Sequence, residues 1–140
     1  MSTLDGQLYI DAVIVKGIGR TLTASIEHRN EDDTDFEIFS LNPYDIRFRV
    51  LGSADGNGQV LIEKIIGHDT DESTIGLITN DGETGTFSFT ITADDTNFLG
   101  LGSKPISIEL LDRETLQPVI NLTEGGVAQG EFSKITIIRP

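Results

Sequence analysis

The sequence of 140 residues contains no cysteine and no tryptophan, and its one methionine is the first residue. Without cysteine the chain can form neither a disulfide bond nor a thiolate metal site, and its redox compartment stays open. Cations are scarce too, with 10 lysines and arginines against 23 aspartates and glutamates, for a formal net charge of -13. Because nucleic acids and anionic membranes are bound through lysine and arginine, this balance argues against both as partners. It favours solubility, or an electropositive protein partner.

Long apolar runs are also missing. No segment approaches the length of a transmembrane helix. Residues 1–17 lack the basic start of a signal peptide, and Asp11 interrupts their apolar stretch. We therefore expect synthesis and use in the cytosol. We also expect a flexible N-terminal arm over residues 1–7 and one domain over residues 8–140, which is long enough for a hydrophobic core.

Residues 85–102 carry the clearest pattern of the chain. Phe87, Phe89 and Ile91 alternate with serine and threonine, so that one face is apolar and the other is rich in hydroxyl groups. The aromatic and β-branched composition suits a half-buried strand. This stretch therefore predicts a strand with one face on the core.

A short helix is expected directly after that strand. Thr92 and Asp95 have the spacing of a capping box, which predicts one helical turn near residues 93–99. Glycines at positions 100 and 102 would end it. Three apolar side chains at this turn are expected to be buried, namely Phe98, Leu99 and Leu101.

Alternating apolar and polar residues recur in other short segments. Together with the strand just described, they predict strands over residues 8–15, 20–28, 44–50, 60–66, 74–78, 105–110, 119–122 and 132–138. Turn signals separate them at intervals of about 8–12 residues, as in an antiparallel sandwich or barrel. We therefore predict an all-β fold, a single antiparallel β-sandwich of about eight strands.

No motif indicates catalysis or a bound metal. The acidic residues 31–35, and Asp69, Asp71 and Glu72 in a second loop, could supply oxygen ligands to Ca²⁺. No twelve-residue calcium loop is present, so solvated loops are the favoured interpretation. The two histidines are forty residues apart and no G-x-S-x-G elbow occurs, while the paired aspartates at 94 and 95 are better explained by helix capping. We predict a non-enzymatic protein without catalytic residues, metal or cofactor.

The first predicted strand is apolar on both faces. Its outer face carries Tyr9, Val13 and Val15, which are the candidate interaction residues. Burial of this face inside the domain is the favoured interpretation. The alternative is contact with another subunit, either by strand addition or face to face.

The order of these signals over residues 17–138 resembles the immunoglobulin-like β-sandwich domains of tailed-phage virion proteins, as in the N-terminal domain of upper baseplate proteins. The resemblance rests on the glycine turn before residues 19–26, the alternating arginines of residues 39–49, and the strand and capped turn of residues 85–102. Two departures are the sequence of residues 40–43, where the family usually has Asp-Leu-Thr-Gly, and Lys104-Pro105-Ile106, where it usually has an aromatic residue. The matching residues have structural roles and are Phe87, Phe89, Ile91, Thr92, Asp95 and Gly102.

This resemblance implies a virion structural protein of a tailed bacteriophage, made in the host cytoplasm. It would bind no cofactor and dock by its sandwich onto other virion proteins, in several copies of a symmetric assembly, as a tail or baseplate component or a capsid decoration. The alternative is a calcium- or carbohydrate-dependent binding module. The acidic loops favour that alternative, whereas the aromatic content disfavours it, because only Tyr9 and Tyr44 could stack on a sugar.

Overall fold

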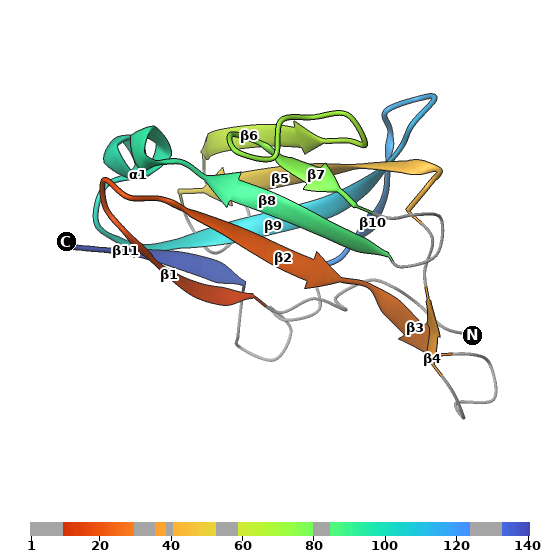
Figure 1. Cartoon of the computed structure of the whole chain (residues 1–140), viewed down its shortest axis with the longest axis horizontal. Coiled ribbons are helices and arrows are strands. Elements are labelled where there is room, and N and C mark those ends of the chain that lie inside the picture. Colours follow the sequence, from red (N-terminus) through yellow and green to blue (C-terminus); the bar gives the residue numbers. More distant parts are fainter. Residues whose placement is uncertain (1–9, 30–35, 39–40, 53–58, 80–84, 124–132) are drawn as a thin grey trace.

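The computed structural model describes residues 10–29, 36–38, 41–52, 59–79, 85–123 and 133–140. These residues are mostly in strands, with one short helix (Figure 1). In chain order the elements are β1 (Asp11–Val15), β2 (Arg20–Ser25), β3 (Glu27–Arg29), β4 (Phe36–Ile38), β5 (Tyr44–Leu51), β6 (Val60–Ile66), β7 (Gly76–Ile78), β8 (Thr86–Ile91), α1 (Ala93–Leu99), β9 (Gly102–Asp112), β10 (Pro118–Asn121) and β11 (Lys134–Ile138). The prediction of an all-β fold is therefore confirmed.

The strands form two larger sheets and one small ladder. The first sheet has the order β1-β11-β9-β5-β6, and β10 also pairs with β9. The second sheet has the order β2-β8-β7, and it crosses in front of the first in Figure 1. The antiparallel pair β3–β4 continues beyond the end of β2. The region predicted as one strand over residues 20–28 is thus divided at Ile26, which lies between β2 and β3.

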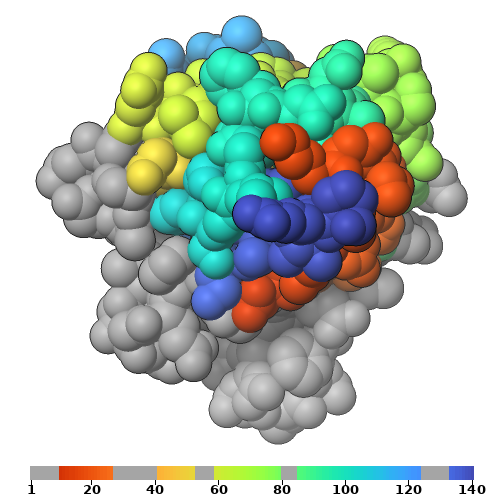
Figure 2. Space-filling model, turned by 90° about the vertical axis from the view of Figure 1, so that its left-hand side faces the viewer, coloured from red at the N-terminus to blue at the C-terminus, as the bar shows by residue number. Residues whose placement is uncertain are grey.

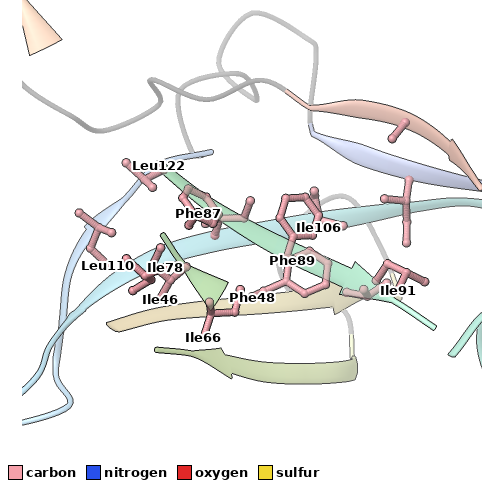
Figure 3. Packing of buried hydrophobic residues seen from close by; sticks show 14 of the residues in the cluster. Ile46, Phe48, Ile66, Ile78, Phe87, Phe89, Ile91, Ile106, Leu110 and Leu122 are labelled. Carbon is pink, nitrogen blue, oxygen red and sulfur yellow. The ribbon is translucent and has the colours of Figure 1, made fainter. Parts of the chain in front are cut away.

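The core fills the space between these two sheets. Phe48 of β5 and Phe89 of β8 meet with their ring centroids 4.7 Å apart, and Phe87 lies 6.2 Å from Phe89. All three rings are fully buried, and Figure 3 shows them among the aliphatic side chains of both sheets. The rings of both pairs are tilted by 31°, and aromatic pairs at such distances add to the stabilisation that apolar burial provides. The predicted core role of the β8 side chains, including Ile91, is confirmed.

The other face of β8 is also buried, whereas the sequence predicted a half-buried strand with this face exposed. Ser88 and Thr90 are buried, where the backbone of β7 contacts Ser88 and the segment before β7 contacts Thr90. The Thr90 hydroxyl donates to the Glu72 carbonyl at 2.6 Å, and it also meets the Thr21 hydroxyl at 2.7 Å. The Ser88 hydroxyl accepts from the Leu77 N–H at 3.2 Å. These hydrogen bonds satisfy the polar side chains that the sequence pattern had assigned to solvent.

One strand pairing departs from the predicted antiparallel arrangement. β1 pairs with β11 in parallel, with Asp11 opposite Lys134 and Val15 opposite Ile138. The prediction of a purely antiparallel fold is therefore wrong for this pair. The chain crosses from the first sheet to the second between β1 and β2, so no hairpin partner follows β1 in its own sheet.

β9 changes partners along its length. Its first residues pair with β11, and pairing with β5 begins only at Ile106. Pro105 lies at this change of partner, where Ile106 donates its N–H to the Ser133 carbonyl at 2.9 Å. The missing N–H of Pro105 consequently breaks no β5–β9 hydrogen bond. The predicted start of the strand at Pro105 was three residues late, because β9 begins at Gly102, which has a positive φ of 110°.

Candidate interaction surface

α1 is held in place by the predicted capping box. The Asp95 N–H donates to the Thr92 hydroxyl at 3.0 Å, and the Thr92 N–H donates to Asp95 Oδ2 at 2.9 Å. Thr96 and Leu99 are the buried residues of the helix. Among the described residues this seven-residue helix has neither the length nor the apolar content to span a bilayer.

The turn between β1 and β2 lies directly against α1. The Gly17 N–H donates to the Thr96 hydroxyl at 2.8 Å. Gly19 has a φ of 80°, and a Cβ atom at this position would lie only 2.6 Å from the carbonyl oxygen of Ile91. Glycine is therefore required there by both the backbone conformation and the close approach. The consequence is that the turn and the helix form one continuous end of the molecule.

Four large apolar side chains are exposed at this end. Ile18 of the turn is 70% exposed and Phe98 of α1 is 69% exposed, while Leu101 and Ile138 are also exposed. The predicted burial of Phe98 and Leu101 is therefore wrong, and only Leu99 is buried. Figure 2 looks onto this end, where the β1–β2 turn (orange-red), α1 with the start of β9 (teal to cyan) and the C-terminal residues (dark blue) adjoin. We call these four side chains the α1-end surface.

Backbone contacts tie these segments together. The Lys16 N–H donates to the Ile138 carbonyl at 2.9 Å, which joins the turn to the end of β11. Gly102 is in register with Ile137, so Leu101 comes next to the end of β11 as well. The four apolar side chains thus belong to neighbouring segments, although they are far apart in the sequence.

The candidate interaction residues of β1 adjoin this surface. Val13 is 49% exposed and Val15 is partly buried, whereas Ala12 and Ile14 between them are buried in the core. Val15 is in register with Ile138, which connects the outer face of β1 with the α1-end surface. Tyr9 lies outside the described residues. At Val13 the sequence interpretation of burial within the domain does not hold.

The geometry of the β1 edge bears on how a partner could approach. Arg20 Nη1 donates to the Val13 carbonyl at 3.1 Å. The Val15 carbonyl accepts from the N–H groups of Ile18 and Gly19 at 3.1 and 3.3 Å. Strand addition needs free backbone acceptors along the edge. Since these carbonyls already have donors, a contact through the exposed side chains suits this edge better than strand addition.

Cations accompany the exposed apolar side chains. Four of the ten lysines and arginines lie on the same segments, namely Lys16, Arg20, Lys104 and Arg139. Lys104 Nζ donates to the Leu101 carbonyl at 3.2 Å, which places this charge beside the surface. Four other cations form ion pairs, namely Arg47 with Glu109, Arg49 with Glu63, Lys64 with Asp95 of α1, and Arg113 with Asp45. Sequence reasoning missed this grouping, because the four residues come from three separate parts of the chain.

The acidic candidates do not come together as a metal site in the part of the chain that is described. No group of three or more histidine, aspartate or glutamate side chains that could hold a metal ion occurs among those residues. Asp71 accepts from the Ser73 hydroxyl at 2.7 Å and from the Ser73 N–H at 3.0 Å, and these bonds hold the pKa of Asp71 below its usual value. The acidic residues 31–35 lie outside the described ranges. His68 Nε2 is 3.3 Å from the Leu41 carbonyl, and nothing is described of the His28 side chain.

The fold and this surface define an all-β protein that exposes apolar side chains together with cations at its α1 end. Neither a scan against protein-family models nor a search of curated proteins gave a match to the chain.

Proposed function

We propose that the two sheets form an immunoglobulin-like β-sandwich. In such domains one sheet contains strands B, E and D and the other contains G, F and C, with a C′ strand added in variable-type domains. The order β2-β8-β7 corresponds to B-E-D, and β11-β9-β5-β6 corresponds to G-F-C-C′. The order along the chain also agrees, with β1 as the first strand and β3, β4 and β10 as additions. This correspondence of both sheets supports the resemblance that the sequence motifs carry.

We further propose that the protein is a non-enzymatic structural component of a tailed-phage virion. It docks by its sandwich onto other virion proteins, in the tail or baseplate or as a decoration on the capsid, and is made in the host cytoplasm. The observation that carries this proposal is the α1-end surface, since exposed apolar side chains gathered at one place are typical of protein–protein contact sites. The resemblance of residues 17–138 to phage virion domains supplies the kind of partner.

The copy number in purified particles tests this function. Quantitative mass spectrometry against the major capsid protein would give the ratio for particles of the phage that encodes this chain. A ratio near that of the capsid protein would indicate a decoration or a tube-associated protein. A ratio equivalent to one or a few rings would indicate the neck, tail tip or baseplate. Absence of the protein from purified particles would refute the proposal.

A further inference from the structure

The α1-end surface combines two features that are uncommon on so acidic a chain. In the described part of the chain nine large hydrophobic side chains are exposed, and four of them form this surface. Four of the ten cations of the chain lie on the same segments. Exposed apolar side chains bordered by one sign of charge are typical of an interface whose register is set by electrostatic complementarity.

Acidic residues are correspondingly rare on these segments. Of the 23 aspartates and glutamates, only Asp94 and Asp95 lie within residues 16–20, 93–104 and 136–140. Asp95 already binds Lys64 Nζ at 2.5 Å, which leaves Asp94 as the exposed carboxylate. Outside these segments the described side chains include nine carboxylates against five cations, so the α1 end and the described remainder of one molecule are electrostatically complementary. The nine carboxylates are those of Asp11, Asp45, Glu63, Asp69, Asp71, Glu72, Glu109, Asp112 and Glu114.

We propose that the α1-end surface docks onto the acidic remainder of a second copy of this chain, in a head-to-tail contact. This inference rests on the proposed function, because it names one partner for the docking surface. A symmetric contact between two α1-end surfaces would bring four cations against four cations, which opposes that geometry. A head-to-tail contact pairs each cationic end with an acidic surface. In an open assembly it leaves the α1 end of one terminal copy and the acidic surface of the other terminal copy free.

Such a contact extends into a ring or an open filament, according to the rotation between successive copies. Each single contact is weak, because the net charge of -13 on every copy opposes association at long range. Several contacts closing a ring, or copies held by a common scaffold, would strengthen each other through effective concentration. The expected behaviour in solution is therefore self-association that depends on protein concentration.

Sedimentation velocity of the purified chain tests the contact, from about 10 μM to about 1 mM, where a weak single interface becomes populated. The test variant is Ile18→Ser with Phe98→Gln, which removes apolar surface without a change of charge. The control is Val60→Ser with Ile65→Gln on β6, where the original side chains are 40% and 39% exposed and the carboxylate of Glu63 is already paired with Arg49. We expect association of the wild type and the control, and at least a tenfold weaker association of the test variant. A wild type that stays monomeric, or equal association of both variants, would overturn the proposal.

A mixing experiment separates head-to-tail from symmetric docking. Because the chain has no cysteine, a single Thr23→Cys in the test variant, at an exposed position of β2 where the strand has no carboxylate, accepts one fluorophore. In a head-to-tail contact, excess unlabelled wild type still binds the acidic surface of the labelled variant and increases its sedimentation coefficient. In a symmetric contact the variant lacks half of the interface and sediments unchanged, which would contradict the proposed geometry. Monomeric behaviour of a protein that is present in particles would overturn this contact alone, whereas absence from particles would overturn the proposed function.

Discussion

Replacement of Lys64 is the most informative test of how the two sheets and α1 are joined. Lys64 lies on β6, the edge strand of the first sheet, and its side chain points inward beside Phe48 and is only 11% exposed. Its Nζ donates to the Thr74 carbonyl at 2.7 Å, the Thr90 carbonyl at 2.6 Å and Asp95 Oδ2 at 2.5 Å. One ammonium group therefore uses all three donors to join β6, β8 and α1. An inward-pointing charge is also one way in which natural sheets protect an edge strand.

Lys64→Met keeps the length and the apolar stem of the side chain but removes all three donors. The Thr90 carbonyl then stays buried without its donor, and a buried unsatisfied polar group costs about 1–3 kcal/mol. Asp95 loses its counter-charge but keeps the Thr92 N–H, and it is partly exposed, which limits that loss. Removing one member of a buried ion pair costs about 3–5 kcal/mol. With partial exposure we expect a decrease of about 2–4 kcal/mol in the free energy of unfolding.

Urea unfolding followed by circular dichroism measures this decrease. With a slope of about 1–3 kcal/mol/M, the midpoint should fall by about 1 M or more, with the slope unchanged. Lys16→Met is the matched control and should stay within about 0.5 kcal/mol of the wild type, since Lys16 is a partly exposed lysine at the α1 end. A double-mutant cycle with Asp95→Asn isolates the ion pair. A Lys64→Met protein as stable as the control would refute the role of these hydrogen bonds.

Three further changes test other parts of the structure. Gly19→Ala should lower the free energy of unfolding by about 2–4 kcal/mol in thermal unfolding, because the positive φ is strained and the new Cβ would lie 2.6 Å from the Ile91 carbonyl oxygen. Gly17→Ala should lower it by only about 1 kcal/mol, because Gly17 also has a positive φ but a Cβ there meets nothing within 4 Å. Equal effects would contradict the close approach of the turn. Leu116 is exposed and has a φ of 59°, which strains a residue with a side chain. Leu116→Gly should therefore stabilise the protein by about 0.5–1 kcal/mol and raise its melting temperature. A lowered melting temperature would show instead that the Leu116 side chain contributes packing. The pKa of Asp71 is lowered by Ser73, so its contribution is present above the unfolded pKa and is lost as the pH falls through the folded pKa. Asp71→Asn should therefore be less stable than the wild type in urea at pH 7, and the difference should begin to decrease only when the pH falls below about 4. A difference that stays constant as the pH falls further would contradict this linkage.

The core and the capping box were predictable because their signals are local. Alternation along one strand already identifies which side chains share a face, and Phe87, Phe89 and Ile91 are all fully buried. The Thr92–Asp95 pair needs only a spacing of three residues to form both of its hydrogen bonds. Neither signal depends on which strands become neighbours.

Non-local features could not be predicted in the same way. The parallel β1–β11 pair joins residues at the two ends of the sequence, and no pattern within either strand specifies the direction of its partner. The burial of Ser88 and Thr90 depends on contacts with β7 and with the segment before it, at a face that the alternation alone assigns to solvent. Lys64 occupies an inward position of β6 between Ile62 and Ile66, where the sequence offers no reason for a charge until three acceptors from other elements are placed around it.

The exposure of Phe98 could have been predicted from the phase of the helix. Successive residues of a helix are separated by about 100°, so Thr96 and Leu99, three positions apart, lie on one face. Phe98 is two positions after Thr96 and therefore points away from that face, whatever its hydrophobicity. The grouping of cations beside Phe98 has no such local signal, because a net charge is only the sum of the charges and does not indicate where they lie. A net charge of -13 predicts an electropositive partner, whereas the cations at the α1 end favour an acidic one, which is why we propose a second copy of this acidic chain as the partner.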